Sequence, residues 1–209
     1  RVEEALRVME EYTNQPEWNS IRYDIYTLEK NILLPLHHPE IKRGVYVISD
    51  DIDVLLKATQ MGATMVQLRG KNDSKASLYN KAQNYLAKRT HPDIPFIIND
   101  HLDIAITVKA DGLHTGQDDI SPSIQRQLMG DTMIIGKTTH SFKQGQQAKA
   151  DGANYVSVGP IWDTPSKPNR PGIGLDYLKQ AHELELPFVA IGGINKERAL
   201  ECATYSPYM

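Results

Sequence analysis

The chain of 209 residues is 40% hydrophobic and 23% charged, the composition of an ordinary globular protein with one principal core. Its formal net charge of −3 provides no basic field that would attract nucleic acid or an anionic membrane surface, so we expect small-molecule partners and leave a homo-oligomer open. Its apolar runs fall far short of the roughly 20 residues that span a membrane. Its single cysteine, Cys202, excludes an intrachain disulfide. We therefore predict a soluble protein of the cytoplasm.

Two amphipathic helices are expected at the start of the chain. Apolar side chains recur at helical spacing in residues 1–12 and again in residues 19–34. Residues 14–16, which end in a proline, separate the two helices, and Pro35 together with Pro39 is expected to end the second. We therefore predict a helical hairpin and linker over residues 1–39, which either mediates dimerisation or docking or packs on its own barrel.

From Gly44 onward, short β-rich runs alternate with polar stretches that are compatible with helices. The runs are too short for helices and lack polar alternation, as expected of strands buried on both faces. They comprise residues 45–49, 65–68, 96–98, 112–114, 133–135, 155–158 and 188–191. Alternating β and α elements predict a parallel sheet, either an open doubly wound sheet or a barrel.

The spacing of the predicted strands favours the barrel. One strand begins about every 24 residues, which is the length of a minimal β/α repeat in an eightfold barrel. On this spacing an eighth strand would begin at about residue 212, beyond Met209. We therefore predict an α/β fold of the (β/α)8 TIM-barrel class over residues 40–209, truncated after strand seven and lacking its last β/α unit in this chain.

Polar residues follow every predicted strand at its carboxyl end, where the loops of a parallel barrel form the active site. Asp100 and Asp119 supply the sparse carboxylate ligation that Mg²⁺ prefers when phosphates complete its shell. Arg69 and Lys71 lie two residues apart, so both can face a pyrophosphate. Gly192-Gly193 can bring backbone N–H groups to a phosphate, although it equally fits a turn with positive φ. For each charge taken singly, an exposed loop residue is the alternative.

Three histidines also follow strands, namely His101, His114 and His140. A metal site or an acid–base set is open, but no two of them have helical ligand spacing, and structural hydrogen bonding is the favoured interpretation. The sequence contains no Walker motif and no dinucleotide-binding glycine motif after a strand, which disfavours nucleotide hydrolysis and hydride transfer.

Taken in order, the strand-end motifs resemble the thiamine-phosphate synthase family over residues 44–194. They are GVYVISD at 44–50, QLRGK at 67–71, IND at 98–100, ADGLHTGQDD at 110–119, GKTTH at 136–140, VGPIWDTPSK at 158–167 and AIGGI at 190–194. Three positions depart from the common pattern of the family. Gly70 replaces an acidic residue, Thr138 replaces a serine, and Ser166 replaces a threonine.

The resemblance implies a Mg²⁺-dependent enzyme that joins 4-amino-2-methyl-5-hydroxymethylpyrimidine pyrophosphate to thiazole phosphate, giving thiamine phosphate and pyrophosphate. It implies that Gln67, Arg69, Lys71 and Asn99 hold the pyrimidine pyrophosphate, that Asp100 and Asp119 ligate Mg²⁺, and that Thr138 lies near the pyrimidine. It also implies that Thr164 and Ser166 line the thiazole phosphate side, that Lys167 reaches the pyrophosphate, and that Gly193 meets the thiazole phosphate. The expected catalytic residues are Arg69, Lys71, Thr138 and Lys167, which contact the reactants without forming a covalent intermediate.

Two alternative functions stay open at this point. A thiazole tautomerase of the same architecture would rely on histidine instead of Mg²⁺, and the presence of Asn99-Asp100, Asp119 and Lys167 disfavours it. A non-catalytic phosphate-ligand-binding barrel, in which the helical hairpin contacts a partner, stays open because the eighth strand is absent from this chain.

Overall fold

A computed structural model of the chain describes residues 2–37, 40–165 and 170–209. The chain divides into two compact units, residues 1–38 and residues 39–209. The predicted boundary lies one residue further along. Within the described ranges, no helix combines the length and the apolar character needed to cross a bilayer.

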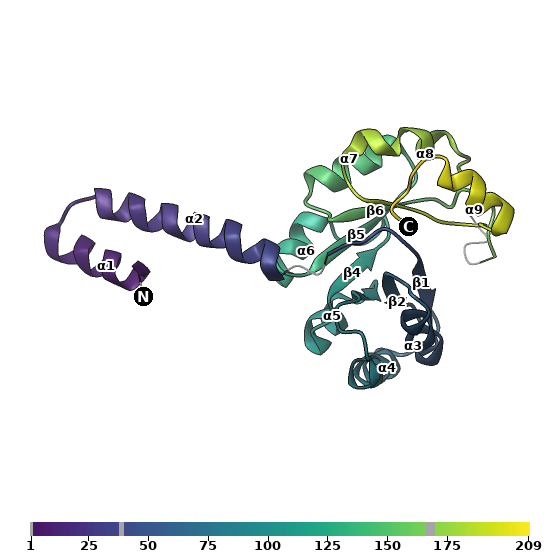
Figure 1. Cartoon of the computed structure of the whole chain (residues 1–209), viewed down its shortest axis with the longest axis horizontal. Helices are drawn as coiled ribbons and strands as arrows, with labels where there is room; N and C mark the ends of the chain where they lie inside the picture. Colours follow the sequence, from purple (N-terminus) through teal and green to yellow (C-terminus); the bar gives the residue numbers. More distant parts are fainter. Residues whose placement is uncertain (1, 38–39, 166–169) are drawn as a thin grey trace. The chain divides into compact units, whose positions relative to one another are not determined.

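The first unit is a pair of helices that lie side by side, α1 (Val2–Thr13) and α2 (Glu17–His37) (Figure 1). An ion pair between Glu10 and Arg22, with 3.1 Å between nitrogen and oxygen, connects them. Of the two prolines predicted to end the second helix, Pro35 does not end it, because α2 continues to His37, and Pro39 lies outside the described residues. Proline removes one helical hydrogen bond and its ring crowds the carbonyl one turn earlier, but the residues after it can still donate their N–H groups.

Seven parallel strands form one sheet in the second unit, and each strand pairs with the next along the chain (Figure 1). Their bounds are β1 Tyr46–Ser49, β2 Met65–Leu68, β3 Phe96–Asn99, β4 Gly112–Thr115, β5 Ile134–Thr139, β6 Tyr155–Val158 and β7 Phe188–Ala190. An open doubly wound sheet reverses its strand order at a switch point, whereas a TIM-type sheet keeps consecutive order. The fold is therefore α/β with a TIM-like sheet.

A helix follows each strand and covers the outer face of the sheet. The bounds are α3 Ile52–Gln60, α4 Lys75–Lys88, α5 Leu102–Val108, α6 Pro122–Met129, α7 Phe142–Ala150, α8 Asp176–Gln180 with a 3-10 turn at Ala181–Leu184, and α9 Lys196–Ala203. Side chains of Asp51, Ser74, Ser141 and Asn195 accept hydrogen bonds from backbone N–H groups in the first turns of α3, α4, α7 and α9. These caps hold the strand-end loops close to the starts of the helices.

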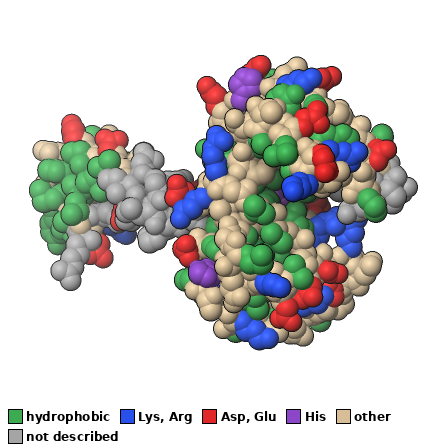
Figure 2. All heavy atoms as spheres, turned by 45° about the vertical axis from the view of Figure 1, so that its right-hand side comes forward, with side chains coloured by type: hydrophobic (Ala, Val, Ile, Leu, Met, Phe, Trp, Pro, Cys, Tyr) green, Lys and Arg blue, Asp and Glu red, His purple; other side chains and the backbone are tan. Residues whose placement is uncertain are grey.

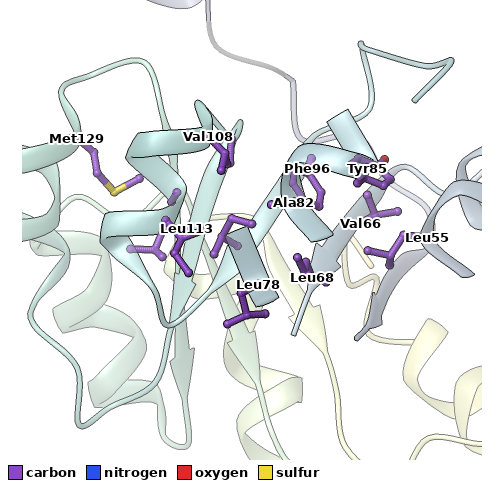
Figure 3. Packing of buried hydrophobic residues seen from close by; sticks show 14 of the residues in the cluster. Leu55, Val66, Leu68, Leu78, Ala82, Tyr85, Phe96, Val108, Leu113 and Met129 are labelled. Carbon is purple, nitrogen blue, oxygen red and sulfur yellow. The ribbon is translucent and has the colours of Figure 1, made fainter. Parts of the chain in front are cut away.

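Strands β2, β4, β5 and β6 bury both of their faces, as their unbroken apolar runs predicted, whereas β1 is half-buried. Toward the helices, side chains of α3, α4 and β3 converge in one cluster, in which the Tyr85 ring stacks on Phe96 with 4.2 Å between ring centroids (Figure 3). Toward the interior, a second cluster is formed by Met65, Ile97, Ile134, Tyr155 and Val189. Alternate residues of each strand thus belong to two different layers.

The last described residues take part in backbone pairing. The N–H of Tyr208 donates to the oxygen of Phe188 at 2.9 Å, and the N–H of Ala190 donates to the oxygen of Met209 at 2.8 Å. On the other side, the N–H of Gly44 donates to the oxygen of Tyr208 at 2.9 Å. Residues 208–209 therefore lie between β7 and the residues that precede β1. This position comes earlier in the chain than the predicted start of an eighth strand, because the connection through α9 is shorter than the average repeat.

Candidate active site

A cavity of about 1410 Å³ lies at the carboxyl ends of the strands and reaches Gly44 and Met209. It brings together every predicted site residue that the structure describes. These are Gln67, Arg69, Lys71, Asn99, Asp100, Asp119, Thr138, Thr164 and Gly193. Two further predicted site residues, Ser166 and Lys167, lie outside the described residues.

The turn after β2 carries the two predicted cations, Arg69 and Lys71. The N–H of Arg69 donates to the oxygen of Ser49 at 2.9 Å, which fixes this turn to the end of β1. Glycine at position 70 has a packing reason, since a Cβ there would overlap the Asp73 carboxylate. That carboxylate accepts hydrogen bonds from Ser77 Oγ at 2.8 Å and Lys81 Nζ at 2.7 Å. Glycine at position 70, where the family commonly has an acidic residue, therefore leaves room for the ion pair between Asp73 and Lys81 of α4.

The two predicted metal ligands, Asp100 and Asp119, are electrostatically coupled. Loss of hydration at the cavity wall and then the Asp119 carboxylate raise the pKa of Asp100, while Asn99 and Arg69 oppose this shift. Asp119 Oδ2 accepts a hydrogen bond from the N–H of Gly116 at 2.7 Å, and its second carboxylate oxygen can still ligate a cation. A divalent cation would relieve the repulsion between the two carboxylates, so the donor set fits Mg²⁺.

The described part of the chain contains no cluster of three or more His, Cys, Asp or Glu side chains suited to a metal. A cation held by Asp100 and Asp119 would therefore need further oxygen ligands from water or from a bound phosphate. The substrate-completed Mg²⁺ site stays a prediction.

Lys137 fixes the loop that carries Asp119. This lysine is buried on the helix-facing side of β5, and its Nζ donates to the main-chain oxygens of Asp119 at 3.2 Å and of Ile120 at 3.3 Å. Burial lowers the pKa of Lys137, and the Asp119 carboxylate opposes the shift. In the sequence Lys137 lies within the strand-end motif at residues 136–140, which does not reveal this role. Successive side chains of a strand point to opposite faces, so Lys137 must point away from the face on which Thr138, the next residue, lies. This alternation was the signal in the sequence.

Five polar side chains form a chain of hydrogen bonds across the barrel interior: Gln67, Tyr46, Tyr155, His114 and Thr138. Gln67 Nε2 donates to Tyr46 OH at 2.5 Å, and the two phenol oxygens are 2.9 Å apart. His114 Nδ1 lies 2.9 Å from Tyr155 OH, and its Nε2 lies 2.9 Å from Thr138 Oγ1. Structural hydrogen bonding, the interpretation favoured for the histidines, is confirmed for His114.

The other predicted histidines lie elsewhere. His140 Nδ1 is hydrogen bonded to the main-chain oxygen of Gly159 at 2.5 Å, which also confirms a structural role. His101 stands at the start of α5, and its side chain makes no capping hydrogen bond there. The structure therefore does not bring the three histidines together as one metal site.

The turn after β7 fits one of the two interpretations offered for its glycines, a turn with positive φ. The phosphate contact of Gly193 stays a prediction. Gly193 has a φ of +64°, and a Cβ there would lie 2.6 Å from the oxygen of Asp163. Arg198 Nη1 donates to the oxygen of Gly193 at 2.6 Å, and the guanidinium lies 4.8 Å from the centroid of the Trp162 ring. Both the backbone conformation and the close approach of the β6 loop therefore require glycine. The sequence analysis did not identify Arg198, which holds these two loops together.

Strand order and the strand-end cavity together define a TIM-like α/β protein with a polar site at the carboxyl ends of its strands. A sequence profile described as "Thiamine monophosphate synthase" matches residues 43–206. The chain therefore belongs to the thiamine monophosphate synthase family, as its motifs indicated.

Curated relatives agree with this assignment. The chain is 36% identical over 221 residues to a thiamine-phosphate synthase of Gloeobacter violaceus, and the match covers 94% of this chain and 61% of that protein. A thiamine-phosphate synthase of Halalkalibacterium halodurans is 43% identical over 153 residues, which cover 71% of this chain and 72% of that protein. The chain thus spans about three fifths of the length of the first of these relatives.

Solved structures give the same result at the level of the fold. A thiamine phosphate pyrophosphorylase from Pyrococcus furiosus superposes with a TM-score of 0.72 at 28% identity, covering 83% of this chain and 85% of that chain. An N-acetylmannosamine-6-phosphate 2-epimerase from Clostridium perfringens superposes with a TM-score of 0.59 at 12% identity, covering 82% of this chain and 87% of that chain, which shows a shared fold alone.

Proposed function

We propose that this chain carries the active site of a thiamine-phosphate synthase. This transferase condenses 4-amino-2-methyl-5-hydroxymethylpyrimidine pyrophosphate with thiazole phosphate, giving thiamine phosphate and pyrophosphate. The supporting observation is that two cations, Arg69 and Lys71, line the same cavity as two coupled carboxylates, Asp100 and Asp119. A pyrophosphate leaving group needs cationic groups and a metal site in this combination.

The reaction requires no protein nucleophile. The thiazole nitrogen provides the electron pair for the new C–N bond to the pyrimidine methylene carbon, and the C–O bond breaks with its electrons on pyrophosphate. In this proposal Arg69 and Lys71 stabilise the charge on the leaving group, and Gln67 and Asn99 bind the pyrimidine substrate with Thr138 beside its ring. Lys167 is assigned to the leaving group as well. Holding both reactants in one cavity supplies proximity.

The β6 and β7 loops are assigned to the thiazole phosphate. Thr164 lines the cavity, and Gly193 presents the bare backbone of a turn with positive φ. Ser166, two residues after Thr164 in the sequence, is assigned to this side by its place in the motif. Backbone N–H groups in such turns bind phosphate well.

The metal of this proposal is Mg²⁺, held by Asp100 and Asp119. The raised pKa of Asp100 supports a site that gains from a cation. When bound, Mg²⁺ would neutralise charge on the pyrophosphate oxygens.

Three finer features accompany the proposal. The barrel is completed to eight strands with the eighth starting at Tyr208, a position supported by its hydrogen bonds to Phe188 and Gly44.

The protein works in the cytoplasm on small molecules and not on nucleic acid, in line with the mixed acidic and basic side chains on the face of the barrel unit seen in Figure 2. Exposed apolar side chains of the hairpin, such as Tyr12 and Tyr23, support a homo-oligomer, which sedimentation velocity would test.

The test is direct. The purified chain is incubated with both substrates and Mg²⁺, and thiamine phosphate and pyrophosphate are measured. Formation of both products in equal amounts supports the synthase. Proton exchange on the thiazole substrate without the pyrimidine substrate would instead identify a tautomerase, and substrate binding without any turnover would identify a binding protein.

A further inference from the structure

The hydrogen-bond chain inside the barrel has two ends with different chemistry. At one end, Gln67 approaches Tyr46 OH with its amide nitrogen, which can only donate. At the other end, the Thr138 hydroxyl both lines the cavity and bonds to His114 Nε2. The members between these ends are buried or half-buried, so every hydrogen atom in the chain needs an acceptor.

The donor end determines the direction of every following bond. Tyr46 OH accepts from the amide, so its single hydrogen goes to Tyr155 OH, which lies 2.9 Å away. Tyr155 OH then donates its own hydrogen to His114 Nδ1. A histidine that accepts at Nδ1 while neutral carries its hydrogen on Nε2, and this hydrogen points to Thr138 Oγ1.

We propose that this chain runs in one direction from Gln67 to Thr138, holds His114 as the neutral Nε2–H tautomer, and leaves the Thr138 hydroxyl as a donor to a ligand atom in the cavity. Tyr46, Tyr155 and His114 are then positioning residues that act through Thr138. The ligand atom must offer a lone pair as an acceptor, as an unprotonated aromatic ring nitrogen does. Only this last assignment, a nitrogen of the pyrimidine ring, rests on the proposed function.

Several features hold the chain in this arrangement. Burial raises the pKa of Tyr46 and of Tyr155, so both phenols keep their single hydrogen at neutral pH. The His114 ring stacks on the Tyr155 ring with 5.4 Å between centroids. Glycine at position 136 leaves room for that ring, because a Cβ there would overlap the Tyr155 phenol. In an interior of low dielectric, two donors or two acceptors facing each other would be costly.

The tautomer of His114 can be observed without any ligand. The protein is labelled with ¹⁵N-histidine and studied by NMR at a pH above 8. The His114 signals are assigned by their loss in the variant His114→Gln. We expect a protonated Nε2 and an unprotonated Nδ1. A protonated Nδ1 would overturn the proposal, because exchanging the two atoms of the Gln67 amide reverses every bond in the chain. Gln67→Glu presents only acceptors to Tyr46, so it should move the proton to Nδ1.

The role of Thr138 as a donor is tested by kinetics. Tyr155→Phe keeps the ring but removes the hydroxyl between Tyr46 and His114, so we expect the KM for the pyrimidine pyrophosphate to rise about tenfold while the KM for thiazole phosphate stays unchanged. Tyr177→Phe is the matched control, since its buried hydroxyl bonds to Thr139, 2.7 Å away on the other face of β5. An equal effect of both variants, or none from Tyr155→Phe, would show that the hydrogen-bond chain does not position Thr138. The NMR result stands even if the protein lacks synthase activity.

Discussion

The Lys137 ammonium lies 3.2 Å from the main-chain oxygen of Asp119. A buried cation thus holds, from behind the sheet, the loop that carries a proposed Mg²⁺ ligand. Gln125 reinforces this contact, because its Nε2 donates to the oxygen of Ile120 at 2.8 Å. The position of the carboxylate is therefore coupled to β5 and α6.

Replacing Lys137 with methionine is expected to weaken Mg²⁺ binding. Methionine preserves the length and packing of the side chain but cannot donate to the Asp119 loop, and losing a contact behind a metal ligand typically lowers metal affinity about 10- to 100-fold. Titration of activity with Mg²⁺ measures the change. Lys143→Met, an exposed lysine on α7, is the control and should behave like the original chain. An unchanged Mg²⁺ dependence in Lys137→Met would remove this lysine from the metal site.

Replacing Asp100 with asparagine should separate metal binding from folding. The variant loses one negative ligand, so Mg²⁺ affinity and turnover should both fall, and excess Mg²⁺ should partly restore turnover. In EDTA its thermal stability should not fall, because the variant loses a charge whose burial, and then whose repulsion from Asp119, raise the pKa of Asp100. Asp50→Asn, another aspartate that lines the cavity, is the control. Activity of the original chain that persists in excess EDTA would contradict the metal assignment.

Gly193→Ala should reduce thiazole phosphate binding. Alanine costs about 1 to 2 kcal/mol in a left-handed conformation, and here its Cβ would also press on the oxygen of Asp163. Gly174→Ala is a matched control, because Gly174 has a φ of +71° but nothing lies within 4 Å of the added Cβ. Calorimetric titration with thiazole phosphate should show at least a tenfold loss of affinity for Gly193→Ala alone. Equal losses in both variants would indicate backbone strain and not a phosphate contact.

Tyr85→Phe is expected to stabilise the protein. The Tyr85 side chain is fully buried, and its hydroxyl has no hydrogen-bond partner among the described residues. Removing an unsatisfied hydroxyl while keeping the stack on Phe96 should raise the free energy of unfolding by about 1 kcal/mol. Thermal unfolding should show a rise of about 2 to 4 °C in Tm. Tyr177→Phe removes a paired hydroxyl and should lower Tm. A lower Tm in Tyr85→Phe would show that water or another group satisfies the hydroxyl.

The sequence alone predicted the TIM-type fold and most of the candidate site. Apolar runs without alternation identified strands buried on both faces, and their spacing favoured a barrel over an open sheet. Because parallel strands end at the same edge, residues as far apart in sequence as Arg69 and Gly193 could be assigned to one cavity before any coordinates were available. The structure places both of them in that cavity.

The tertiary structure decided which strand-end residues support the site from behind. Lys137 and Thr138 are neighbours in the sequence, yet β5 continues through both of them and points them to opposite faces of the sheet. The pairing of Tyr46 with Tyr155 joins strands that are distant in the chain. Composition and spacing cannot reveal such contacts, because they depend on the register between strands and on the closeness of side chains across the barrel interior, both of which arise only when the sheet curves around its core.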